Sequence, residues 1–187
     1  LSAEQMRDYF ANRYAPNNMV LACCGNFEFG AICSLAEAEC GKWAPSEVTR
    51  ELSFYPGSKD KQRTEKANLV REHICLVSPA APMQDERRFA TSLLAMIIGD
   101  STGSRYFWGL VDPAIAETAG MQYESMDGVG VLYSYIRCGS ENVSKVAEIL
   151  RGIFEDLTAH GVGEDELRTA RNKVLSALTI KCEQPMG

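Results

Sequence analysis

The stretch AETAGMQYESMDGVGVLYSYIRC, residues 116–138, indicates most about the fold of this chain. It contains two strand-like runs, 116–126 and 129–138, joined at Asp127-Gly128. An Asp-Gly pair is typical of tight hairpin turns, because glycine readily adopts the positive φ that such turns require. The stretch therefore predicts an antiparallel β-hairpin.

Helical patterns flank this hairpin on both sides. The predicted elements around it are a strand over 67–78, buried on both faces and ended by Pro79, and helices over 84–98, 104–111, 143–157 and 167–182. Gly161-Val162-Gly163 is expected to end the helix over 143–157, because glycine readily supplies left-handed backbone geometry. The apolar residues of the helical segments recur every three or four positions, so each helix presents one apolar face. The order β-α-α-β-β-α-α predicts an α+β fold, in which helices cover one face of a two-layer antiparallel or mixed sheet.

Residues 1–43 form a separate helix–strand–helix pattern. Ser2 and Gln5 fit a capping box at a helix start, and Pro16 disfavours helix in the residue before it. The predicted elements are a helix from Ser2 to about Tyr14, a short buried strand over 19–24 and a helix over 30–40.

Residues 44–65 show neither the three-to-four-residue spacing of a helix nor the two-residue alternation of a strand. They contain two prolines, Gly57-Ser58 and the charged run Lys59-Asp60-Lys61, which predicts an extended linker with a strand over 48–54. The predicted organisation is thus 1–43, a linker over 44–65, and 66–187. One compact permuted domain is the alternative arrangement.

The composition excludes several classes of function. The chain has 187 residues and a formal net charge of -6, which disfavours a nucleic-acid partner because phosphate binding needs clustered Lys and Arg. The longest uncharged apolar stretch, residues 89–99, is about half of the ~20 residues of a membrane span. We expect no membrane association and no secretory leader. The predicted compartment is the cytoplasm, with the periplasm and mitochondrial matrix open as alternatives.

The seven cysteines have irregular spacing and include no C-x-x-C pair. That pattern matches neither a zinc ribbon nor a thioredoxin-type motif. We expect buried, reduced thiols of the kind found in cytoplasmic proteins.

The chain has too few histidines to form a catalytic zinc site. Such a site needs three protein ligands, usually with two histidines on one helix, whereas His73 and His160 lie on separate predicted elements. The acids Glu164, Asp165 and Glu166 begin a helix, where carboxylates complement the helix dipole. We therefore expect no metal and no cofactor bound by this chain.

Gly99-Asp100-Ser101-Thr102-Gly103 spells G-x-S-x-G, the pattern of the serine-hydrolase nucleophile elbow. Asp156 and His160 follow in a permissible order. An elbow requires a strand before the serine, however, and a buried helix is predicted there. A loop between helices is the preferred interpretation, and a serine hydrolase is a weak alternative.

Four segments, taken in their order and spacing, resemble the M16 metallopeptidase family of insulinase, pitrilysin and mitochondrial processing peptidase. They are YAPNNMVL at 14–21 with GNF at 25–27, SRYF at 104–107, GEDEL at 163–167 with ARNK at 170–173, and EQPMG at 183–187. The resemblance covers nearly the whole chain.

The resemblance implies a LuxS/MPP-like metallohydrolase fold of two homologous halves around a chamber. In the family, zinc is held by an inverted H-x-x-E-H and a later glutamate in the first half, which would lie upstream of Leu1. The resemblance thus implies zinc for the intact parent protein but not for this chain. It places most of the second, non-catalytic half in residues 66–187, and the closing helix–strand–helix of the first half in 1–43.

The resemblance also implies substrate contacts in the second half. Several family members have an arginine after the S-R-L-F segment and a tyrosine seven positions later, but Val111 and Thr118 occupy these positions here. We predict Arg105, Tyr106 and Tyr123 as substrate-contact residues, with Tyr123 as a shifted substitute for the family tyrosine.

The expected function is the non-catalytic, substrate-enclosing portion of a zinc-dependent M16 peptidase. The alternative is an inactive M16-like subunit with a structural or processing-partner role. The expected partners are an N-terminal catalytic half, a peptide substrate in the parent, and a second copy of this chain. In that homodimer, residues 1–43 would be swapped to cover an open sheet edge.

Overall fold

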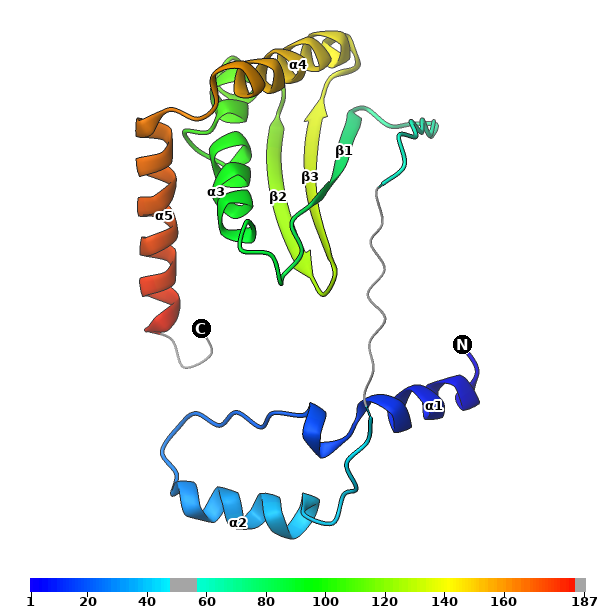
Figure 1. The fold of residues 1–187 in the computed structure, drawn as a ribbon. Coiled ribbons are helices and arrows are strands. Elements are labelled where there is room, and N and C mark those ends of the chain that lie inside the picture. The colour runs from blue at the N-terminus through cyan, green and yellow to red at the C-terminus, as the bar shows by residue number, and fades with distance from the viewer. Residues whose placement is uncertain (48–56, 184–187) are drawn as a thin grey trace. The chain divides into compact units, whose positions relative to one another are not determined.

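The computed structural model describes residues 1–47 and 57–183 (Figure 1). They fall into two compact units. Unit 1 lies within Leu1–Glu51 and Ile180–Gly187, and unit 2 lies within Leu52–Thr179. The predicted strand over 48–54 lies outside the described residues, and the predicted three-part boundaries stay a prediction.

Unit 1 is built from short helices. They are α1 (Ala3–Arg13), the 3₁₀ turn Pro16–Asn18 and α2 (Phe29–Cys40). The capping box is confirmed, because the Ser2 hydroxyl accepts from the Gln5 N–H and the Gln5 side chain accepts from the Ser2 N–H. Asn17 ties the turn to the segment after α2 through two hydrogen bonds with the backbone of Ser46.

The predicted strand over 19–24 is wrong for this chain, because these residues are irregular. A strand is stable only when a neighbour pairs with its backbone donors and acceptors, and no described part of unit 1 forms a strand. The segment is also exposed rather than buried, with Val20 at 94% and Leu21 at 71% of full exposure.

The described part of unit 2 contains a three-stranded antiparallel sheet in the order β1-β3-β2. Its strands are β1 (Glu72–Ala80), β2 (Thr118–Met126) and β3 (Val129–Cys138). The predicted hairpin is confirmed: β2 and β3 pair directly, and Gly128 has a φ of 72° at the turn. Among the described strands, β1 and β2 are the two edges.

The first strand differs from its prediction in bounds and environment. It begins at Glu72 rather than at residue 67, and it continues through Pro79, which was expected to end it. Proline is tolerated at a sheet edge, where a missing N–H removes no ladder hydrogen bond, and β1 is such an edge. Most of β1 is exposed rather than buried on both faces, because β3 alone pairs with it among the described residues.

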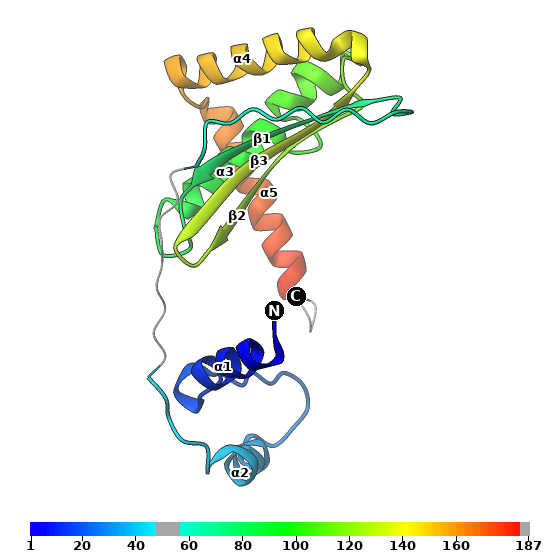
Figure 2. The same cartoon turned by 90° about the vertical axis from the view of Figure 1, so that its right-hand side faces the viewer.

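The helices of unit 2 pack on one face of this sheet (Figure 2). They are α3 (Arg88–Gly99), a π-helical segment (Phe107–Val111), the 3₁₀ turn Ser140–Asn142, α4 (Val143–His160) and α5 (Glu164–Cys182). The left-handed Gly161, with a φ of 73°, ends α4 as predicted. The α+β class with helices over an antiparallel sheet is confirmed.

The core of unit 2 lies between these helices and the sheet. Its fully buried side chains include Tyr106, Leu110, Ile136, Cys138 and Val146. The helix α3 contacts β2 so closely that a Cβ on Gly99 would lie 2.1 Å from the backbone nitrogen of Met121. Of the described helices, none is long and apolar enough to cross a membrane.

Candidate functional site

The edge strand β2 borders a cavity of about 640 Å³. The other wall of the cavity is α3 with the loop that follows it. Its lining comprises residues 118–124 of β2, together with Ser92, Ala95, Met96, Gly99, Asp100 and Ser101. An edge strand carries a row of unpaired backbone donors and acceptors, and extended peptides bind such edges by adding a strand. We call this cavity the β2 groove.

Tyr123 is the one predicted substrate-contact residue that lines the β2 groove. It sits opposite Leu132 of β3, and its hydroxyl donates to the carbonyl oxygen of Ala81 at 2.5 Å. This hydrogen bond fixes the half-buried phenol. Thr118, which the resemblance aligns with the family's tyrosine, lines the same groove.

Arg105 holds the junction between α4 and α5. Its Nε and Nη2 donate to the two carboxylate oxygens of Glu166 at 2.8 and 2.9 Å, and Nη1 donates to Asp156 Oδ2 at 2.7 Å. Nη2 also donates to the carbonyl oxygen of Gly161 at 3.1 Å. The Arg105 side chain is only 16% exposed. Four of its contacts therefore join the end of α4, the connecting loop and the first turn of α5.

The carboxylates of this cluster are held in their charged form. Hydrogen bonding from Arg105 is the main cause that lowers the pKa of Glu166. The pKa of Asp156 is lowered first by its hydrogen bond with His160 and then by that with Arg105. From its sequence position Glu166 is predicted only to complement the helix dipole, since no local pattern reveals a partner 61 positions away.

Tyr106 belongs to the core. It is fully buried, and its hydroxyl shares a hydrogen bond with Ser134 Oγ at 2.9 Å. Burial raises the pKa of the Tyr106 phenol, and the bond to Ser134 opposes part of that shift. The three predicted site residues are thus placed in three settings: Tyr123 in a groove, Arg105 in an ion cluster and Tyr106 in the core. Their role in substrate contact stays a prediction.

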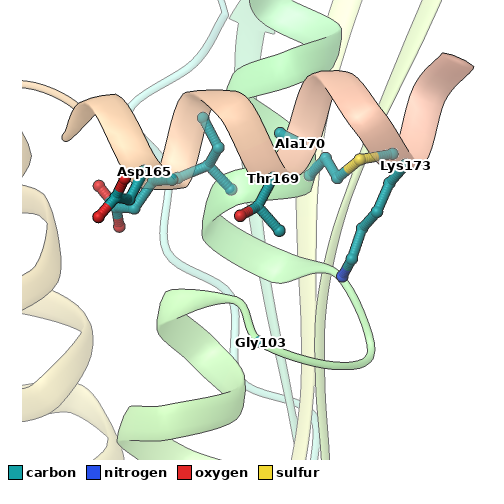
Figure 3. A pocket seen from close by; sticks show the side chains of 8 residues that line it. Gly103, Asp165, Thr169, Ala170 and Lys173 are labelled. Atoms are coloured by element: carbon teal, nitrogen blue, oxygen red, sulfur yellow. The ribbon is translucent and has the colours of Figure 1, made fainter.

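The G-x-S-x-G loop follows α3, so a helix rather than a strand precedes Ser101. Lys173 of α5 anchors the loop through an ion pair with Asp100 and a hydrogen bond to the carbonyl oxygen of Thr102 at 2.6 Å. Figure 3 shows the Lys173 side chain reaching from α5 toward the loop that carries Gly103. The cavity beside it holds about 220 Å³, and its charged groups pair within the protein. This geometry matches an anchored inter-helix loop, not a nucleophile elbow.

The two histidines lie apart on different elements. His73 is on β1, and its Nδ1 lies 2.5 Å from the Tyr135 hydroxyl oxygen. His160 ends α4 and pairs with Asp156 at 2.8 Å. In the residues that the structure describes, no three His, Cys, Asp or Glu side chains cluster closely enough to hold a metal ion.

Unit 1 presents an apolar surface. Within residues 1–47, Ala15 alone is buried. Met6, Phe10, Leu21 and Leu35 are each at least 60% exposed. Several large apolar side chains this exposed are typical of a surface that another polypeptide covers.

Comparison with known proteins places the chain in a family. Residues 1–174 match the model for the peptidase M16 inactive domain. The chain is 23% identical to an uncharacterized zinc protease of Streptomyces coelicolor, over 98% of this chain and 42% of that protein. It is 21% identical to the uncharacterized zinc protease YmxG of Bacillus subtilis, over 97% of this chain and 44% of that protein.

Solved structures show the same fold. A protease from Helicobacter pylori matches with a TM-score of 0.74 and 15% identity, over 99% of this chain and 46% of that one. A peptidase M16 inactive domain from Pseudomonas fluorescens matches with a TM-score of 0.72 and 16% identity, over 94% of this chain and 43% of that one. The chain spans less than half the length of these relatives. The match over residues 1–174 shows that the chain belongs to the peptidase M16 inactive-domain family.

Proposed function

We propose that this chain is the substrate-enclosing, non-catalytic portion of a zinc-dependent M16 peptidase. The match to an inactive domain carries this proposal, together with relatives that are named zinc proteases and are more than twice as long as the chain. In the proposed parent, an N-terminal half holds zinc and the catalytic glutamate. Zinc held there would supply Lewis-acid chemistry that polarises a peptide carbonyl and lowers the pKa of water, while this chain contributes binding surface.

The proposed substrate surface is the β2 groove. An extended peptide there would pair with the outer edge of β2, which no other described strand pairs with, and pass Tyr123, whose phenol is fixed by Ala81. Arg105 and Tyr106 support the groove indirectly in this proposal. Arg105 holds the α4–α5 junction, and Tyr106 links the segment after the loop to β3 through Ser134.

The proposed peptidase activity is tested with the purified parent protein. Purified parent should cleave an internally quenched peptide, and a zinc chelator should abolish the cleavage, whereas this chain alone should show no turnover. A parent that folds and binds zinc but cleaves no peptide in a broad panel would favour the inactive-subunit alternative. Ester hydrolysis lost in Ser101→Ala would support the serine-hydrolase alternative instead.

Peptide binding in the β2 groove is tested with a variant of the parent. Ser92 is exposed on α3 and lines the groove, so Ser92→Trp should fill it and raise KM several-fold with little change in kcat. Ser144→Trp, at an exposed position on α4 outside the groove, is the matched control. An unchanged KM in Ser92→Trp would contradict peptide binding at this edge.

We further propose that residues 1–43 dock on a partner. Their exposed apolar side chains support this, because unit 1 buries almost nothing within its described residues. The partner in the parent is the catalytic half, and for the isolated chain it is a second copy. Light scattering should show a dimer that Leu21→Glu weakens, while Val70→Glu, which also changes an exposed apolar residue, leaves the mass unchanged. A monomer at all concentrations would contradict the swap.

The proposed compartment is the cytoplasm. All seven cysteines are free thiols, although six of them are at least partly exposed rather than buried as expected. Exposed thiols persist in a reducing compartment, whereas an oxidising one favours their pairing.

A further inference from the structure

The face of the sheet opposite the helices carries a second cavity, of about 820 Å³. One wall is the extended segment 57–66, which runs beside β1 (Figure 2). A Cβ on Gly57 would lie 2.9 Å from Pro79 Cγ, so the segment begins near the end of β1. The floor is formed by β1 and the start of β3. We call this cavity the β1 slot.

The wall and the floor of the β1 slot differ in chemistry. Gly57 lines it, and so does every second residue from 58 to 66: Ser58, Asp60, Gln62, Thr64 and Lys66. The rest of the lining comes from Leu69, from β1 and from the start of β3: His73, Cys75, Val77, Ser78, Pro79, Val129, Gly130 and Val131. The slot thus has a polar, charged wall and a mainly apolar floor, and the wall has the two-residue period of extended chain.

The backbone beside the slot has unused hydrogen-bonding capacity. Residues 58–64 belong to no helix, strand or turn, and they make no backbone–backbone hydrogen bond with other described residues. The outer edge of β1 is equally unpaired in the described part of the sheet. Backbone donors and acceptors of this kind are satisfied when another extended chain pairs with them.

The polar wall of the slot carries two opposite charges. Asp60 and Lys66 are six residues apart on the same wall, which corresponds to about 20 Å of extended chain. A matching ligand has an acidic group for Lys66 and a basic group for Asp60. Between them it has alternating apolar residues for the floor and small polar residues for the wall.

We propose that the β1 slot binds an extended peptide of about seven residues with a basic residue at one end and an acidic residue at the other. The slot is separate from the β2 groove, because β1 and β2 are opposite edges of the described sheet. A polypeptide bound here is held without being cleaved, and the inference does not depend on zinc in the parent.

The test uses the full chain and two labelled peptides in fluorescence anisotropy. The first probe is acetyl-Lys-Val-Thr-Val-Thr-Val-Glu-amide, and the second replaces its final Glu with Lys. The wild-type chain should bind the first peptide about two- to fivefold more tightly, as expected for one partly exposed ion pair. Lys66→Glu should reverse this preference. Lys145→Glu, the same charge change on an exposed residue of α4, should preserve it.

Cys75 on the floor locates the bound peptide, since it is an exposed thiol within the slot. Saturating peptide should slow its alkylation, measured by mass spectrometry, and leave that of Cys182 unchanged. Binding without protection of Cys75, or a preference that Lys66→Glu does not alter, would overturn the proposal. Protection of Cys75 by rising protein concentration alone would also overturn it, by showing that a second copy fills the slot.

Discussion

The two units of this chain have similar apolar content in their helices but differ in what those helices bury. In unit 2, side chains from α3, the π-helical segment, α4 and the sheet meet in a core whose central members, such as Leu110 and Ile136, are fully buried. In unit 1, the helices α1 and α2 have no buried residue. A sheet gives helices a surface to pack against, and the described part of unit 1 contains no sheet. Burial in the described residues is therefore concentrated in unit 2, and this supports the proposal that unit 1 docks on a partner surface.

The largest expected effect comes from truncating one leucine side chain in each unit. Leu110→Ala should lower the free energy of unfolding by about 2–5 kcal/mol, because it removes a fully buried side chain from the core. Leu35→Ala in α2, where the side chain is 60% exposed, should change it by less than about 0.5 kcal/mol. Urea unfolding followed by circular dichroism measures both. Equal losses would show that unit 1 has a core after all.

The close approach of α3 to β2 gives the next effect. Gly99→Ala places a methyl group against the backbone of Met121 and should cost about 1–3 kcal/mol. Gly152→Ala in α4 is the matched control, because no atom lies within 4 Å of its added Cβ. That control should gain up to about 1 kcal/mol from helix propensity. A stable Gly99→Ala protein would contradict the observed contact.

The Arg105 cluster predicts a smaller, pH-dependent effect. Arg105→Lys loses the two-pronged contact with Glu166 and should cost up to about 1 kcal/mol at pH 7. Since the pKa of Glu166 is lowered in the folded protein, the stabilisation is fully present above the ordinary glutamate pKa of about 4.3. It is lost as pH falls through the lower, folded value.

Unfolding measured in steps from pH 7 to pH 3 should therefore show the wild-type and Arg105→Lys curves converging at the acid end. Arg168→Lys is the control, because Arg168 pairs with Asp165 at a largely exposed position. A difference that stays constant over this range would exclude Glu166 as the origin of the effect.

The alkylation rates of the cysteines compare the two units without any mutation, and they are the mildest of these tests. Cys138 of unit 2 is buried, and burial is the main cause that raises the pKa of its thiol, so it should resist alkylation in the native chain. Cys23 and Cys24 of unit 1 are exposed and should react within the first minutes. Mass spectrometry with and without denaturant measures this. Early labelling of Cys138 would indicate that the core opens readily.

Features that depend on neighbouring residues can be predicted from this sequence, whereas features that depend on distant residues cannot. The Asp127-Gly128 turn, the capping box at Ser2 and the glycine that ends α4 were predicted because each depends on residues close in sequence. The strand over 19–24 was predicted from local apolar character, yet a strand needs a neighbour that local sequence does not provide. The β2 groove could not be foreseen, since it depends on α3 packing beside an edge strand.

By itself, the sequence determined the α+β class, the hairpin, the resemblance to M16 peptidases and the lack of a histidine-rich zinc motif, because composition, short spacing and motif order express these properties. Only the tertiary structure decided that Arg105 pairs with Glu166, that Tyr106 is buried, and that a polar wall and a mainly apolar floor line the β1 slot. The physical reason is distance along the chain. Contacts between residues tens of positions apart depend on how the elements pack, and no local pattern specifies that packing.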